Sequence, residues 1–328
     1  MRIHATLRWL ALVASSWRLL RRYPPKFPAV TLLALAIALG GCGVGAPVAD
    51  RFALQHSYSV NDPHFVRVMD QFCGRPFIAG NTITTFDDHH EIYPAMLEAI
   101  ATATRTITFE TFIFQSDEVG RPFIEALIER SRAGVKVHLL VDDLGSGKFE
   151  AADETAMKDA GIAIVRYNPM TKAFLIFPAA ETNHRTHRKL LVIDGRIGFT
   201  GGIGVGDLWL GEGQGGLPWR DTFYRVEGPA VAQMQAAFME NWLKTLGQVL
   251  DDDSYFPELP AAGAAQCQVV TCVPEQGESR MELMYLLAIN AAERTLDVAT
   301  PYFIPGYHLS KALADAIERG VRVRLVLP

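Results

Sequence analysis

Two copies of one strand–helix–strand pattern lie in this chain of 328 residues, and the repeat limits the folds open to it. The β-rich run 105–114 matches the run 294–303, and the apolar strand pattern that follows each run also matches. A helical pattern precedes the first strand of each copy, at 92–103 and 280–291. Strands and helices that alternate in this way are typical of a sheet covered by helices. The repeat therefore predicts an α/β protein built from two similar halves.

The repeat also predicts how the chain divides. The second copy ends at Pro328, which corresponds to Asp142 of the first copy. We therefore expect the second half to be incomplete and the coding sequence to continue past Pro328. The predicted parts are an N-terminal segment at 1–42, a linker at 43–75, a first domain at 76–250, a second linker at 251–266 and the start of a second domain at 267–328.

The N-terminal segment has the pattern of an export signal. Residues 1–26 hold six Lys and Arg residues and no acidic one, and the apolar run Phe27–Leu39 and then Gly40-Gly41-Cys42 follow. A positive region, a short apolar region and small residues form a signal peptide. The last four residues, from Leu39, resemble a bacterial lipobox, which implies lipidation of Cys42. The segment could instead be an uncleaved membrane anchor, or Cys42 an ordinary thiol. Lipidation and the anchor both place the protein in the bacterial cell envelope, facing the periplasm or the exterior.

The charge of the chain bears on its partners. It contains 31 basic and 36 acidic residues, for a net charge of −5. A domain that binds nucleic acid through a basic face usually has a pI above about 9, so nucleic acid is not favoured as a partner. Apolar residues make up 49% of the chain and charged residues 20%, which excludes general disorder.

One motif carries chemistry. It reads His187-x-Lys189-x4-Asp194 and is followed by the glycine pair Gly201-Gly202. The apolar run 190–193 predicts a buried strand, with a tight turn at Asp194 and a returning strand after it. His187 and Lys189 are two residues apart, so we expect both side chains on one side of the strand.

These residue types suit chemistry at phosphorus. A neutral imidazole can attack phosphorus, and a neighbouring ammonium can neutralise the phosphoryl oxygens. The pair requires neither metal nor cofactor, and we predict none. The acidic and histidine-rich run 87–91 fits a solvated helix start better than a metal site. In the competing interpretation His187 is a surface residue and Asp194 belongs only to a turn.

Over residues 75–328 the sequence resembles the phospholipase D superfamily, and within it the bacterial cardiolipin synthases. The resemblance implies a mixed sheet flanked by helices and a two-step exchange in which His187 forms a phosphohistidine. It makes Lys189 the phosphate-binding lysine and Asp194 the motif aspartate, which we expect to be mainly structural. Beyond the motif, the stretches that carry the resemblance are Gly80-Asn81, 94–100, 109–114, Trp219-Arg220-Asp221, 226–231 and 300–305.

Three further observations concern this site. Glu110 ends the first repeated strand and is our candidate for orienting an imidazole, although a structural role is nearly as well supported. Gly204 stands where the family often has an asparagine, so one phosphate hydrogen bond is in doubt. The family's second motif is absent: by the repeat offset its histidine belongs near position 373. The sequence thus provides half of a family active site.

The favoured function is phosphatidyl transfer of the cardiolipin synthase type, which joins phosphatidylglycerol to a second glycerophospholipid headgroup at a membrane surface. A hydrolytic phospholipase D differs only in using water as the acceptor. Two hypotheses of a different kind are an exported nuclease whose single-motif chains form a homodimer, and a truncated lipoprotein without catalysis. The second-half repeat weighs against the nuclease, because a chain designed for one motif does not need residues 267–328.

Overall fold

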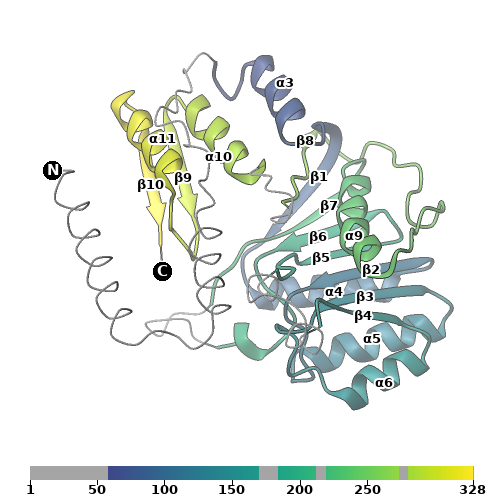
Figure 1. Cartoon of the computed structure of the whole chain (residues 1–328). Helices are drawn as coiled ribbons and strands as arrows, with labels where there is room; N and C mark the ends of the chain where they lie inside the picture. The colour runs from purple at the N-terminus through teal and green to yellow at the C-terminus, as the bar shows by residue number, and fades with distance from the viewer. Residues whose placement is uncertain (1–57, 170–183, 212–218, 273–279, 328) are drawn as a thin grey trace, which may run out of the picture. The chain divides into compact units, whose positions relative to one another are not determined.

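A computed structural model describes residues 58–169, 184–211, 219–272 and 280–327. Both copies of the repeat form a helix followed by two parallel strands joined by a second helix, as the sequence predicts (Figure 1). The first copy consists of α4 (His89–Thr102), β2 (Thr106–Thr111), α5 (Gly120–Arg132) and β3 (Lys136–Asp142). The second consists of α10 (Arg280–Ala291), β9 (Thr295–Ala299), α11 (Tyr307–Glu318) and β10 (Arg322–Val326).

The first copy belongs to a mixed sheet of eight strands in the order β4-β3-β2-β5-β6-β7-β1-β8. β2, β3 and β4 run parallel to one another, and the other neighbouring strands are antiparallel. This mixed sheet confirms the predicted fold class. The remaining strands are β1 (Ile78–Phe86), β4 (Ala163–Tyr167), β5 (Leu190–Ile193), β6 (Ile197–Gly201), β7 (Phe223–Glu227) and β8 (Ala265–Cys267).

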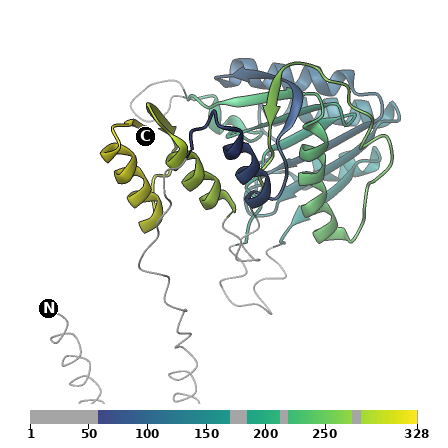
Figure 2. The ribbon, with the colours of Figure 1, turned by 90° about the horizontal axis from the view of Figure 1, so that it is seen from above.

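Helices cover both faces of the large sheet. On one face lie α4, α5 and α6 (Ala151–Asp159), and on the other lies α9 (Val231–Leu246) (Figures 1 and 2). β5 is buried on both sides: Leu191 and Ile193 join the core beneath α4 and α5, whereas Leu190 and Val192 join the core beneath α9. A strand covered on both faces needs a continuous apolar run, and residues 190–193 provide it.

The tight turn predicted at Asp194 and Gly195 joins β5 to β6, and within it the Arg196 N–H donates to the Ile193 carbonyl oxygen at 2.8 Å. Asp194 and Gly195 adopt φ angles of 53° and 63°. Positive φ at both central residues matches the twist of a two-residue hairpin, and aspartate and glycine tolerate it. A Cβ at Gly195 would lie 2.4 Å from the carbonyl oxygen of Tyr255, so the close approach of the chain also requires glycine.

Two features differ from the predicted division of the chain. The range predicted as the first linker contains α3 (Pro63–Phe72), whose start is marked by Asp62, which caps His64 N, and by a proline in the first turn. The boundary predicted at 266/267 falls within β8, which pairs with β1 of the large sheet. Polar composition predicts a linker, but it does not reveal capping geometry or long-range strand pairing.

Candidate active site

The motif lies at the centre of the large sheet. His187 and Lys189 precede β5, which pairs antiparallel with β2 so that Leu190 faces Glu110. The start of β5 therefore lies next to the carboxyl ends of the parallel strands β2, β3 and β4. In open α/β sheets, ligands bind at the carboxyl ends of the strands.

The structure brings His187 and Lys189 together around one aromatic ring. The ring centroid of Phe112 lies 5.1 Å from that of His187, and Lys189 Nζ lies 5.6 Å from the same Phe112 centroid. Lys189 Nζ also donates a hydrogen bond of 2.9 Å to the carbonyl oxygen of His187. The predicted placement of both side chains on one side is thus confirmed.

Burial shifts both side chains toward their neutral forms. It lowers the pKa of His187, and the charge of Lys189 lowers it further, so the imidazole is neutral at physiological pH. Burial also lowers the pKa of Lys189 to about 8, although the negative charge of Asp221 opposes the shift. A neutral imidazole beside an amine that is still mostly protonated at neutral pH suits nucleophilic attack on a phosphate.

Asp221 is a site residue to which the sequence analysis assigned no role. It lies just before β7, where its negative charge opposes the loss of charge on Lys189, and burial raises its own pKa. The N–H groups of Gly202 and Thr222 donate to its carboxylate. A Cβ at Gly202 would lie 2.3 Å from that carboxylate, which explains the second glycine of the pair. The family-like stretch Trp219-Arg220-Asp221 was the available signal.

Asp194 holds two segments together at the far end of β5 from His187. Its carboxylate accepts hydrogen bonds from the N–H groups of Thr104, Arg105 and Thr106 and from the Thr104 hydroxyl, at 2.8 to 2.9 Å. These bonds keep the pKa of Asp194 below its usual range although burial opposes them. The geometry gives the motif aspartate a structural role.

Glu110 does lie beside the motif, but its hydrogen bonds within the described residues bypass the imidazole. The carboxylate bonds to the hydroxyl of Thr186, and Asn241 Nδ2 donates to it at 2.6 Å. Glu110 is completely buried, and burial raises its pKa. The predicted orienting residue therefore contacts the neighbour of His187 rather than the His187 ring.

Gly204, where the family often has an asparagine, lies in a crowded part of the fold. A Cβ at this position would lie 2.8 Å from the carbonyl oxygen of Ile113 and 2.9 Å from the Trp209 ring. The hydroxyl of Tyr93 donates to the Gly204 carbonyl at 3.1 Å. Any larger residue would displace this packing.

A cavity of about 940 Å³ opens beside the motif. His187 and Lys189 line it together with residues before β5, and both apolar and polar residues of β1, β7, α9 and the segment 266–272 form most of the rest of its wall. A cavity lined by the charged residues of the motif and by many apolar side chains suits a ligand with a charged head and an apolar body. The apolar lining includes Ile83, Tyr224, Val226, Met234, Ala237 and Val270.

The acidic and histidine-rich run 87–91 begins a helix. Asp88 caps α4 by accepting hydrogen bonds from the N–H groups of His90 and Glu91. Within the described ranges, no three His, Cys, Asp or Glu side chains are grouped so that they could hold a metal ion.

Comparisons with known proteins agree on one family. The family model described as "Cardiolipin synthase, PLD-like domain" matches residues 96–207 and 285–328. "Cardiolipin synthase 1" of Bacillus anthracis is 32% identical over 284 residues, which cover 84% of this chain and 55% of that protein. "Cardiolipin synthase A" of Pseudomonas syringae pv. syringae is 34% identical over 263 residues, or 80% of this chain and 54% of that protein.

A solved structure shares the fold. The phosphatidylserine synthase of Haemophilus influenzae Rd KW20 superposes with a TM-score of 0.54 and 15% identity, over 80% of this chain and 66% of that one. With this mixed sheet and the His187–Lys189 motif inside the matched range, the chain belongs to the phospholipase D superfamily. Within the superfamily its sequence is similar to the bacterial cardiolipin synthases. The chain spans about half the length of the curated relatives that it matches.

Proposed function

We propose that this protein transfers phosphatidyl groups between phospholipids, as a cardiolipin synthase does, with phosphatidylglycerol as the donor. The observation that carries the proposal is the pairing of His187 and Lys189 around Phe112, beside a cavity that both residues help to line. The similarity to cardiolipin synthases supports the substrate class.

In the proposed reaction a nitrogen of the neutral His187 imidazole attacks the phosphorus of phosphatidylglycerol. A nitrogen–phosphorus bond forms and the bond from phosphorus to the glycerol oxygen breaks, while the Lys189 ammonium neutralises the phosphoryl oxygens. A general acid protonates the departing glycerol. The hydroxyl of a second phospholipid headgroup then attacks the phosphohistidine, and His187 is released.

In the two-step exchange that the family resemblance implies, the general acid is a second histidine. The motif occurs once in the sequence, so that histidine comes from outside these residues. A second copy of this chain in a homodimer is one source, and further sequence of the same protein is the other.

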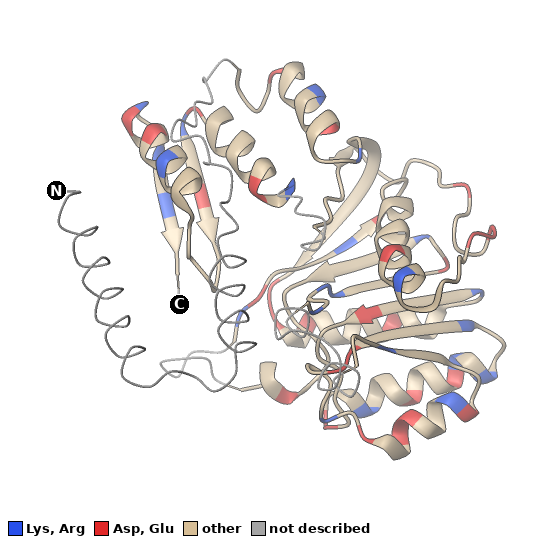
Figure 3. Cartoon of the chain, in the orientation of Figure 1, with Lys and Arg blue, Asp and Glu red and all other residues tan. Residues whose placement is uncertain are grey.

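We also propose that the protein works at a membrane surface of the bacterial envelope, attached through the segment 1–42, which lies outside the described residues. Within the described part of the chain no helix is long and apolar enough to cross a membrane. Both acidic and basic residues occur along α5, α6 and α11 (Figure 3), so these helices are not uniformly basic.

The test uses vesicles of phosphatidylglycerol, with products identified by mass spectrometry and the phosphoenzyme trapped by acid quench. Cardiolipin and free glycerol are the expected products of the wild type. His187→Ala should abolish both products and the phosphoenzyme, whereas His64→Ala, in the surface helix α3, should retain them. Phosphatidic acid alone would identify a hydrolase, and degraded DNA would identify a nuclease. A wild-type protein that is inert both as this chain and with any further sequence of the same protein would refute the proposal.

A further inference from the structure

The residue before the nucleophile is held more tightly than packing requires. We propose that Thr186 is a positioning residue and that Glu110, Asn241 and Asp142, which we call the Thr186 clamp, fix through it the position of His187. The inference rests on the proposed function, because it states how the nucleophile of that reaction is aimed.

The clamp holds the Thr186 side chain through its hydroxyl. The Thr186 Oγ1 bonds to Glu110 Oε1, and Asn241 Nδ2 donates to the same oxygen at 2.6 Å. Asn241 Nδ2 also lies 3.3 Å from Thr186 Oγ1. The three residues come from the end of β2, the approach to β5 and α9, and each is less than 9% exposed. Three separate elements therefore meet at one hydroxyl.

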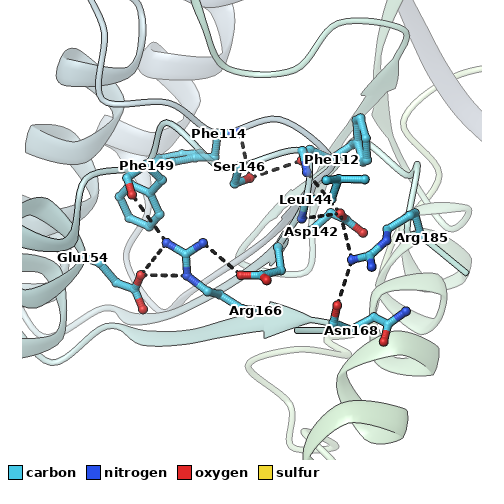
Figure 4. Close-up of polar contacts among 12 residues, drawn as sticks. Phe112, Phe114, Asp142, Leu144, Ser146, Phe149, Glu154, Arg166, Asn168 and Arg185 are labelled. Carbon is cyan, nitrogen blue, oxygen red and sulfur yellow. Dashed lines mark hydrogen bonds and ion pairs between the residues drawn. The ribbon is translucent and has the colours of Figure 1, made fainter. Parts of the chain in front are cut away.

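The clamp also holds the Thr186 backbone. Asp142, at the end of β3, accepts a hydrogen bond of 3.1 Å from the Thr186 N–H. The other oxygen of Asp142 accepts from the N–H of Leu144 at 3.0 Å and lies 3.6 Å from Arg185 Nη1 (Figure 4). Because Asp142 is fully buried and fixed by its own turn, it is a rigid acceptor.

Burial of Glu110 costs more free energy than burial of an apolar side chain at the same position would. It is fully buried, burial raises its pKa, and within the described residues its Oε2 has no hydrogen-bond partner. An unsatisfied buried carboxylate oxygen destabilises a fold, and an apolar residue of similar size would fill this space at lower cost. Its presence beside the motif indicates a role in geometry.

The residues around His187 divide between the two sides of the chain. Thr186 bonds to Asn241 of α9, and Arg188 donates to the Ala237 carbonyl and pairs with Glu240 at 2.7 Å, both also on α9. His187 instead contacts Phe112. The residues on either side of His187 are thus both tied to α9, and the imidazole itself lies against Phe112.

The experiment compares three variants. Thr186→Val removes the hydroxyl but keeps the shape and the N–H, and Thr186→Ser restores the hydroxyl. Thr108→Val is the matched control, because Thr108 is also fully buried on β2 and its hydroxyl donates to Gln235 of α9 at 3.0 Å, away from the motif. The readouts are the NMR signals of the His187 imidazole, assigned by their loss in His187→Ala, and kcat and KM with phosphatidylglycerol.

We expect Thr186→Val to lower kcat at least tenfold with KM within twofold, and to shift or broaden the His187 signals. Thr186→Ser should recover most of kcat, and Thr108→Val should leave kcat and the signals unchanged while costing similar stability. Equal effects of the two valine variants on the His187 signals would overturn the clamp. If the wild type has no turnover, with or without any further sequence of the same protein, the proposed function fails. The His187 NMR signals of the two valine variants still show whether the Thr186 clamp positions the imidazole.

Discussion

Burial has the same physical effect on two side chains of the site, His187 and Lys189, which have different tasks. Both side chains lie against Phe112, and burial favours the neutral form of each. For His187 this yields a nucleophile at neutral pH. For Lys189 burial lowers the pKa to about 8, so this anion-binding group loses its charge within a pH range that experiments can reach.

Anion binding at this site should therefore weaken in mild alkali. The ammonium of Lys189 is fully charged below its pKa of about 8, so affinity for an oxyanion is complete there and declines as the pH rises through that value. Calorimetric titration with sulfate, whose charge is constant, should show about a tenfold loss for each pH unit above 8. Lys189→Met should bind sulfate weakly at every pH. An affinity that stays constant from pH 7 to 9.5 in the wild type would contradict this account.

Asp194 should matter for stability alone. Asn is compatible with the positive φ at this position, so Asp194→Asn preserves the turn but places an amide donor against N–H groups of 104–106. We expect a loss of about 2 to 4 kcal/mol in the free energy of unfolding, measured in urea. Because the folded-state pKa lies below the unfolded value, this contribution is present above about pH 4 and is lost as the pH falls through the lowered pKa.

The control for this prediction is Asp251→Asn, at an exposed position, which should leave stability unchanged. The His187 NMR signals should also persist in Asp194→Asn at low urea. If they vanish while the protein remains folded, Asp194 acts on the site as well as on the hairpin.

At the scale of elements, β3 and α9 meet at a buried histidine. His138 packs against Trp242 and Tyr255 at ring distances of 5.0 and 5.6 Å, and burial lowers its pKa to about 4. In the unfolded chain its pKa is about 6.5. Protons therefore bind the unfolded state first, and stability should decline by about 3 kcal/mol as the pH falls from 6.5 to 4.

His138→Phe tests this interface, since it retains an aromatic ring but cannot titrate. Urea unfolding at intervals between pH 7 and 4 should show a shallower decline for His138→Phe than for the wild type. His64→Phe, in the surface helix α3, is the control and should follow the wild type. Parallel curves for all three proteins would mean that His138 is not a source of the pH dependence.

Local pattern predicted the elements of the repeat well, because their apolar periodicity is strong: the helix at 280–291 has the predicted bounds, and the helix predicted at 92–103 forms over His89–Thr102. The sequence analysis overlooked α9, although Val231, Met234, Phe238 and Trp242 follow a helical spacing. The pairing register of the strands could not be predicted from local pattern, because β1 pairs with β7, which lies far along the chain. Thr186 and Asn241 take part in the site only through such packing, so no local motif marks their roles, whereas the stretch Trp219-Arg220-Asp221 was a local signal for Asp221.

At the scale of the whole molecule, the catalytic motif and the proposed membrane attachment belong to different parts of the sequence. The motif lies in the large sheet, whereas the proposed membrane attachment depends on 1–42, outside the described residues. Two acyl chains give stable attachment to a bilayer, while a single chain binds only marginally. If Cys42 carries the lipid, modification of this one thiol therefore determines whether the protein is bound to the membrane.

Cys42→Ala should move the protein from the membrane fraction to the soluble fraction of the cells that produce it, as measured by immunoblot after ultracentrifugation. The mass of the wild-type protein should show a lipid-modified N-terminal cysteine. Cys272→Ala, at an exposed cysteine in the described part of the chain, is the matched control and should remain with the membranes. If Cys42→Ala sediments with the membranes at the full unprocessed mass, the segment acts as an uncleaved anchor. Apolar burial of Phe27–Leu39 then supplies the attachment, and lipidation has no part in it.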